Sequence, residues 1–134
     1  MGSDSYLKIF ELENGTKIKL ELRDTNGQMK FRPLTKIITM ESKPDCIVIG
    51  FDITMEYTFV EVKKYWYPTV KRILKTNLIY LIGNKIECQY EGVLSLEARD
   101  FAKENNLRYF EVSCRTGKGI DKFLEDLKNE IIKL

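Results

Sequence analysis

Polar residues that could bind a ligand stand where several predicted strands end. Asp24 follows the strand-like run KIKLEL and precedes Asn26-Gly27 and Gln28. Gly83-Asn84-Lys85 follows the apolar run LIYLI, and Ser113-Cys114-Arg115 follows YFEV. In open sheets of mostly parallel strands, ligands bind in the crevice beyond the carboxyl ends of the strands. Together with Asp52, which follows the apolar run CIVIGF, these segments make four candidates for one common binding site.

Each segment also has an ordinary structural explanation. The stretch from Asp24 to Gln28 could be a surface turn, and Gly83-Asn84-Lys85 could be a simple turn after a strand. Asp52-Ile53-Thr54, which ends another apolar run, could cap the helix that follows it. Residues 115–119, RTGKG, are more often a solvated loop than a phosphate cradle. Only the joint order of these segments along the chain favours a shared site.

The elements that must position these residues alternate between strand and helix. The predicted strands are residues 6–12, 16–23, 46–51, 78–82 and 109–113. The predicted helices are residues 56–75, 95–105 and 120–134, and a further short helix could lie between residues 25 and 43. This alternation predicts an α/β fold, a mostly parallel sheet with helices on both faces.

Local signals refine these elements. Asn14-Gly15 predicts a hairpin turn in which both residues have a positive φ. The uninterrupted apolar run 46–51 predicts a strand that is covered on both faces. Pro68 should kink or restart the helix that contains it, and Ser95 should cap the next helix.

Composition excludes several classes of protein. The 134 residues suit one domain, and a net charge of +2 is too small to suggest a nucleic-acid partner. No apolar run approaches the length of a membrane span, and the three cysteines share no metal-like spacing, which favours a reduced, cytoplasmic setting without a membrane anchor in this chain. Residues 1–5, which begin Met-Gly-Ser, are expected to be a tag or a disordered start, so the domain would cover residues 6–134.

Taken together, the motifs resemble those of Ras-superfamily small GTPases. The segment from Asp24 to Gln28, DTNGQ, resembles their DTAGQ signature. The segment from Gly83 to Glu87, GNKIE, resembles GNKxD, and Ser113-Cys114-Arg115 resembles SAK. The stretch EARDFAKENNLRYFEVSCRTGKGI is Rab-like, whereas Arg32-Pro-Leu34 and Trp66-Tyr-Pro68 look more like Rho. The resemblance covers residues 6–134 and favours the Rab branch.

The resemblance implies a role for each residue toward GTP or GDP and Mg²⁺. Asp24 would hold the Mg²⁺ through a water, Gly27 would let the backbone approach the γ-phosphate, and Gln28 would orient the attacking water. The second group of residues would recognise guanine. In that group Lys85 would lie along the base, Glu87 would accept its two donors, and the Cys114 N–H would donate to its carbonyl oxygen. The implied guanine-binding residues are Asn84, Lys85, Glu87, Ser113, Cys114 and Arg115.

The chain departs from the family pattern at several of these positions. Glu87 replaces an aspartate, and its extra methylene displaces the carboxylate, so guanine binding should be weaker. Arg115 replaces a lysine, although its planar guanidinium is not an equivalent of an ammonium group. Asn26 and Met29 replace an alanine and an acid beside Gln28.

The pattern G-x-x-x-x-G-K-[ST] is absent from the sequence. In the family this phosphate loop follows the first strand and precedes the first helix, so the resemblance implies a Ras-like fold without these three parts. We therefore expect this chain alone to bind GTP or GDP weakly or not at all and to be inactive as an enzyme. The missing strand would also leave unpaired strand edges, through which the chain could self-associate.

Three interpretations follow. The chain could be the P-loop-less part of a guanine-nucleotide switch of intracellular signalling or vesicle traffic. It could instead be a degenerate pseudo-GTPase that acts as a protein-interaction module, or an unrelated doubly wound domain that matches by accident. The order of four motifs at strand ends argues against the third. By resemblance, effector or regulator proteins would contact the region after Gln28, which contains Phe31, Arg32 and Leu34, although Leu34 could equally pack inside a helix.

Overall fold

The computed structural model describes residues 4–25, 32–74, 76–88 and 93–134. Contacts within the chain divide it into two compact units, residues 1–43 and residues 44–134. Each unit is described by itself below.

The first unit contains a β-hairpin and one helix. Strands β1 (Asp4–Glu11) and β2 (Lys17–Asp24) pair antiparallel, as the sequence predicted, and helix α1 (Arg32–Ser42) follows. Strand β1 begins at Asp4, so it includes two of the five residues that were expected to precede the domain.

The hairpin turn differs from the predicted tight turn. The last paired residues are Glu11 and Lys17, so the loop is longer than two residues. Within it only Gly15 has a positive φ, of +83°, and Asn14 does not. Asn14 instead contributes its side chain, whose Oδ1 accepts a hydrogen bond of 3.0 Å from the Thr16 N–H. The prediction of two positive φ angles was therefore wrong, because an Asx-type bond replaces the tight backbone turn.

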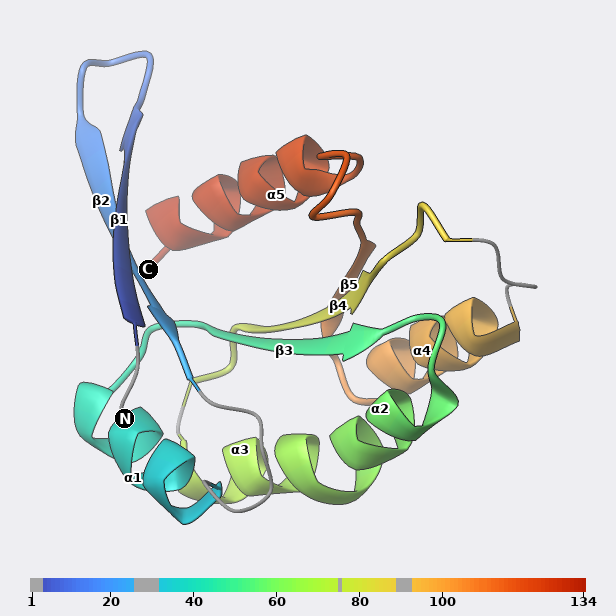
Figure 1. Ribbon diagram of the computed structural model, residues 1–134. Helices are drawn as coiled ribbons and strands as arrows, with labels where there is room; N and C mark the ends of the chain where they lie inside the picture. The colour runs from blue at the N-terminus through green and yellow to red at the C-terminus, as the bar shows by residue number, and fades with distance from the viewer. Residues whose placement is uncertain (1–3, 26–31, 75, 89–92) are drawn as a thin grey trace. The chain divides into compact units, whose positions relative to one another are not determined.

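The second unit is built on a parallel sheet. Strands β3 (Ile47–Asp52), β4 (Ile79–Asn84) and β5 (Arg108–Glu111) lie in the order β3-β4-β5, and each pairs in parallel with its neighbour (Figure 1). All three carboxyl ends consequently lie at one edge. The α/β class with a parallel sheet is confirmed.

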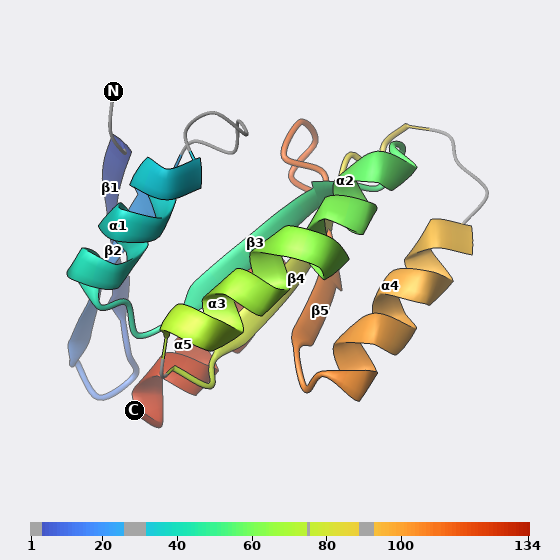
Figure 2. The ribbon, with the colours of Figure 1, turned by 90° about the horizontal axis from the view of Figure 1, so that it is seen from below.

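Helices cover both faces of this sheet, as predicted (Figures 1 and 2). One face carries a continuous helical run, composed of α2 (Glu56–Glu61), the π-helical segment η2 (Val62–Trp66) and α3 (Tyr67–Ile73), together with α4 (Val93–Glu104). The other face carries α5 (Ile120–Ile132). Pro68 stands in the first turn of α3, directly after the π-helical segment, and the backbone before it stays helical at Trp66 and Tyr67. No helix in the described part of the chain is long and apolar enough to cross a membrane.

Aromatic rings form much of the core between these layers. On one face, the rings of Phe51 and Phe59 lie 5.1 Å apart. On the other face, the rings of Tyr80 and Phe123 lie 5.1 Å apart. Helix α5 packs on Tyr80 of β4 and on Phe110 of β5 through Phe123, and it therefore joins these two neighbouring strands on this face.

Two local predictions are corrected by this packing. Val48 of β3 is 42% exposed, so this outer strand is not covered on both faces as its apolar sequence suggested. The reason is that α5 packs on β4 and β5. Ser95 does not cap α4, because the helix already begins at Val93. Its hydroxyl donates instead to the carboxylate of Glu111 at the end of β5.

Candidate functional site

The carboxyl ends of β3 and β4 bring two of the singled-out segments together. Asp52 pairs in register with Asn84, the last residue of β4. The Ile53 N–H donates a 3.0 Å hydrogen bond to the Asn84 carbonyl oxygen, which continues the pairing beyond the strands. Lys85 is therefore the first residue to leave the sheet, next to the end of β3.

The side chain of Asn84 connects the loop after β4 with the loop after β5. Its Oδ1 accepts a 2.8 Å hydrogen bond from the Lys85 N–H and a 3.0 Å hydrogen bond from the Cys114 N–H. A second link is the 3.3 Å bond from the Ile86 N–H to the Val112 carbonyl oxygen. The two segments that the sequence assigned to guanine recognition are thus adjacent.

Lys85 is held in an unusual conformation. Its φ is +74°, a value that non-glycine residues rarely adopt. Its Nζ lies 2.9 Å from Oδ2 of Asp52. Hydrogen bonding to Asp52 raises the pKa of Lys85 above its ordinary value, so the ammonium group is charged at neutral pH.

Asp52 has a different role from the helix cap that the sequence suggested. The N-cap residue of α2 is Met55, and it makes no side-chain capping bond. The Oδ1 of Asp52 accepts hydrogen bonds from Thr54, 2.9 Å from its N–H and 2.6 Å from its hydroxyl. Burial raises the pKa of Asp52, but the hydrogen bonds from Thr54 and Lys85 outweigh burial and hold this pKa below its ordinary value. Asp52 is therefore a charged partner for Lys85.

Glu87, in the loop after β4, also interacts with Ser113 in the loop after β5. Ser113 is fully buried, and its Oγ accepts a 3.0 Å hydrogen bond from the Thr116 N–H. A hydrogen bond from the Ser113 side chain lowers the pKa of Glu87, with smaller contributions that include the nearby charge of Arg115. The Glu87 side chain is exposed and ionised at neutral pH, so its carboxylate can still accept hydrogen bonds from a ligand.

The loop after β5 is built tightly around Ser113. The Ser113 N–H donates to the Lys118 carbonyl oxygen at 2.9 Å, and the Gly117 N–H donates to the Ser113 carbonyl oxygen at 2.8 Å. Gly117 and Gly119 both have positive φ angles, of +85° and +82°. The loop is therefore internally hydrogen-bonded, and its residues 114–118 are exposed, in agreement with the ordinary interpretation as a solvated loop.

The residues assigned to Mg²⁺ and phosphate belong to the first unit or lie outside the described residues. Asp24 is the exposed last residue of β2, in the first unit. Gly27, Gln28 and Phe31 lie outside the described residues, as does the side chain of Leu34. Arg32 opens α1 and is half-buried. Among the described residues, no group of three or more acidic, cysteine or histidine side chains could hold a metal ion.

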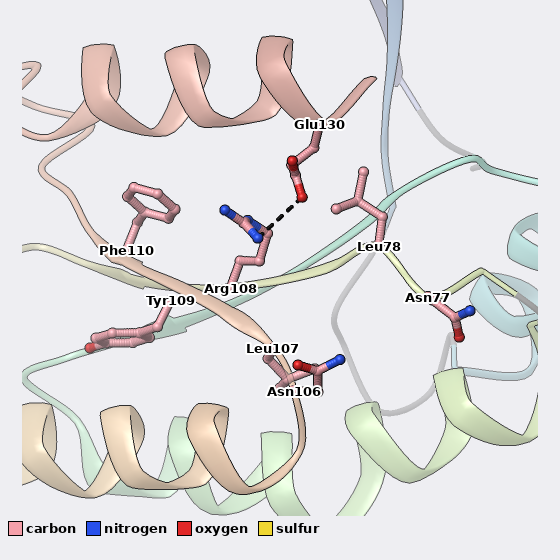
Figure 3. A pocket seen from close by; sticks show the side chains of 8 residues that line it. All are labelled: Asn77, Leu78, Asn106, Leu107, Arg108, Tyr109, Phe110 and Glu130. Carbon is pink, nitrogen blue, oxygen red and sulfur yellow. Dashed lines mark ion pairs between the residues drawn. The ribbon is translucent and has the colours of Figure 1, made fainter. Parts of the chain in front are cut away.

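A separate hollow lies at the opposite edge of the parallel sheet (Figure 3). It has a volume of about 390 Å³, and the segments before β4 and around the start of β5 line it. Arg108 at its centre is already paired, with its Nη1 3.1 Å from Glu130 and its Nε 2.6 Å from Asp126. None of the motif residues lines this hollow, so it is not the candidate site.

Sequence reasoning found most of this site but not the Asp52–Lys85 pair. The signal was present, because two parallel strands that neighbour each other must bring their ends together. What the sequence lacked was the register that sets residue 52 opposite residue 84.

Comparison with known proteins supports the resemblance. The Ras family profile matches residues 1–133. "Ras-related protein Rab-1" of Theileria parva is 32% identical over 124 residues, which cover 91% of this chain and 55% of that protein. "Ras-related protein Rab-2B" of Dictyostelium discoideum is 32% identical over 122 residues, covering 90% and 59%. Human "Ras-related protein Rab-30" is 28% identical over 134 residues, covering 98% and 64%. The chain thus spans about 55–64% of the length of these three relatives.

Proposed function

Because the chain belongs to the Ras family and is a Rab-like small GTPase, we propose that its second unit recognises the guanine base of GTP and GDP. In the protein that contains it, this unit would serve a guanine-nucleotide switch of intracellular signalling or vesicle traffic. The proposal extends to that protein's GTPase activity, to its binding of GTP and GDP and to its protein partners.

One observation carries the proposal. The 3.0 Å hydrogen bond between Oδ1 of Asn84 and the Cys114 N–H joins the loops that hold the two guanine motifs. Short motifs of this kind also occur by chance, so sequence similarity alone is a weak argument for a site. A direct bond between the motifs supports the proposal of a shared base site.

The chemistry of the side chains fits guanine. The Watson–Crick edge of guanine presents two N–H donors beside a carbonyl oxygen. A charged carboxylate can accept both donors, and Glu87 offers one that is exposed and held by Ser113. A protonated carboxyl or an amide in this position would place a donor against a donor.

The Cys114 N–H is not free, although the resemblance assigns it to the guanine carbonyl oxygen. It donates to Asn84 in this structure. Base binding would require Asn84 to share or release this bond, and the cost of that exchange would reduce affinity. The backbone amide of Cys114 should therefore report directly on base binding.

We expect the affinity to be low and this chain alone to lack GTPase activity. The sequence contains no G-x-x-x-x-G-K-[ST], which supplies most phosphate contacts in P-loop proteins. Base contacts alone would then support a Kd of about 1 mM, which corresponds to roughly 4 kcal/mol of binding free energy.

A second candidate function is a protein-interaction module that no longer binds nucleotide. The observation that favours it is that the Glu87 carboxylate already has partners, since it accepts from the Cys88 thiol at 3.7 Å and its pKa is lowered by Ser113 and Arg115. In either case effector or regulator proteins would contact the region that includes Phe31, Arg32 and Leu34, and strand edges could support self-association.

A titration followed by NMR separates the two candidates. The ¹⁵N-labelled chain is titrated with GDP, GMP and, for comparison, ADP, to several times the expected Kd. Base recognition predicts that the amides of Lys85, Glu87 and Cys114 shift with GDP and GMP but not with ADP. The absence of guanine-specific shifts would favour the interaction module.

A further inference from the structure

We infer that Asp52 is a positioning residue, which holds the side chain of Lys85 in place as one wall of the guanine site. The inference rests on the proposed function and adds a residue to it. Asp52 lies outside the motifs that carried the resemblance to guanine-binding loops, and the ordinary interpretation of its position was a helix cap.

Both ends of Lys85 are fixed. At the backbone, its N–H donates to Oδ1 of Asn84 at 2.8 Å, and its carbonyl oxygen accepts a 3.0 Å hydrogen bond from the Cys88 N–H. At the tip of the side chain, Nζ lies 2.9 Å from Oδ2 of Asp52. The four-carbon stem between these points is therefore restrained to a narrow range of conformations.

Asp52 is itself well anchored. Thr54 donates two hydrogen bonds to its Oδ1, so the carboxylate presents Oδ2 to Lys85. The Asp52 N–H donates to the Thr58 hydroxyl at 3.0 Å, which ties the end of β3 to helix α2. An ion pair between two mobile side chains would lose much of its energy to ordering, but here one partner is already ordered.

The pair is unequal in burial, which argues against a purely structural role. The Asp52 side chain is only 12% exposed, whereas that of Lys85 is 52% exposed. The ends of β3 and β4 are already joined by the backbone bond from Ile53 to Asn84. The ion pair therefore adds little to the connection between the strands, and its main effect is to orient an accessible lysine stem beside the guanine loops.

An oriented methylene stem suits the face of a purine ring. Lysine stems commonly cover apolar surface while the ammonium group stays solvated or paired. With the ammonium group held by Asp52, the stem would be preorganised for the base, and less entropy would be lost on binding. Without Asp52 the side chain would move freely in solvent.

The test compares Asp52→Asn with Asp100→Asn. Asp100 is an exposed residue of α4, so D100N removes the same charge away from the site. Lysine acetylation rates, measured by peptide mass spectrometry, report on the ion pair without any nucleotide. We expect Lys85 to react about fivefold faster in D52N than in the wild-type chain, while Lys118 reacts at an unchanged rate and D100N changes neither.

Nucleotide binding provides the second measurement. In the NMR titration, at a temperature where both chains are folded, D52N should bind GDP about fivefold more weakly than wild type. Lys85→Met retains an apolar stem but loses the ammonium group, so it should weaken GDP binding equally. In the double variant the two losses should not add, because both remove the same contact.

The outcomes separate the two proposals. Equal GDP affinity in wild type and D52N, or an unchanged reactivity of Lys85, would overturn the role of Asp52 alone. A wild-type chain that shows no guanine-specific binding would overturn the proposed function, whatever the reactivity of Lys85. Should D52N fail to fold, Lys85→Met still decides the question from the other partner.

Discussion

The side-chain oxygen Oδ1 of Asn84 accepts a hydrogen bond of 3.0 Å from the backbone N–H of Cys114, thirty positions further along the chain. The same oxygen accepts the Lys85 N–H at 2.8 Å. One amide oxygen therefore fixes the starts of two loops relative to each other. This hydrogen bond from the backbone to a side chain holds the two loops together, as backbone hydrogen bonds hold neighbouring strands together.

Removal of this amide should loosen the loop after β5. Asn84→Ala leaves two backbone N–H groups without their acceptor, and we expect the free energy of unfolding to fall by about 1–3 kcal/mol. Hydrogen exchange at the Cys114 amide should accelerate more than this global change explains. The control is Asn105→Ala, which removes a 2.8 Å bond to the Phe101 carbonyl oxygen at the end of α4. Exchange at Cys114 that is no faster in N84A than in N105A would contradict the role of Asn84.

A shorter carboxylate at position 87 should improve guanine recognition. The family pattern has aspartate there, so Glu87→Asp should strengthen GDP binding about tenfold, a change typical of one methylene in a specific pocket. Glu87→Gln should instead favour xanthosine nucleotides over guanosine nucleotides, because the amide offers a donor to the oxygen that replaces the guanine amino group. NMR titrations with GDP and XDP measure both effects. Glu104→Asp, at the exposed end of α4, is the matched control, and a similar gain in that variant would show that the effect is not local.

Asp126 should contribute to the acid sensitivity of the second unit. Arg108 donates two hydrogen bonds to it, at 2.6 and 2.7 Å, and the Tyr80 hydroxyl donates a third at 2.6 Å. The hydrogen bonds from Arg108 are the main reason why the pKa of Asp126 lies below the ordinary 3.8. The folded protein therefore binds this proton less readily than the unfolded chain does. The stability that Asp126 provides is complete above the ordinary pKa and declines as the pH falls from about 4 toward the lower, folded-state pKa.

The variant Asp126→Asn isolates this effect. At pH 7 it should lose about 2 kcal/mol of unfolding free energy, because the charged acceptor of three hydrogen bonds is gone. Between pH 4 and lower values its stability should decline less steeply than that of the wild type. Urea unfolding across this range measures both quantities. Glu125→Gln, whose side chain is 63% exposed, should change neither. Parallel stability–pH curves for D126N and wild type would refute the prediction.

The two glycines of the loop after β5 should differ in their tolerance of a side chain. Both have positive φ angles, but a Cβ at Gly119 would meet the Glu111 carbonyl oxygen, whereas nothing lies within 4 Å of a Cβ at Gly117. Gly117→Ala should therefore cost only the conformational penalty of about 1 kcal/mol, and Gly119→Ala clearly more. Thermal unfolding of the two variants tests this directly. Equal losses of stability in the two variants would contradict the prediction, because they would mean that the positive φ alone sets the cost at each position.

Much of the fold followed from local patterns. The apolar runs before Asp52 and Asn84 were recognisable as strands because a continuous run of that length, bounded by turn residues, suits a parallel sheet. Pro68 was recognisable as the start of a new helix segment because its ring fixes φ and removes a donor. The local signals failed where a distant partner competed with a local one. Ser95 was such a case, because its hydroxyl found Glu111 on another element and not the start of its own helix.

The candidate site divides in the same way. By itself the sequence determined which residues could recognise guanine, since the types and order of Asn84, Lys85 and Glu87 are properties of one short segment. Only the tertiary structure decided that Asn84 bonds to Cys114 and that Lys85 pairs with Asp52. These contacts depend on strand order and register, which are set by the burial of whole faces of the sheet. The spacing of residues along the chain does not specify which strands become neighbours. For this reason only the folded protein identified Asp52 as the partner of Lys85.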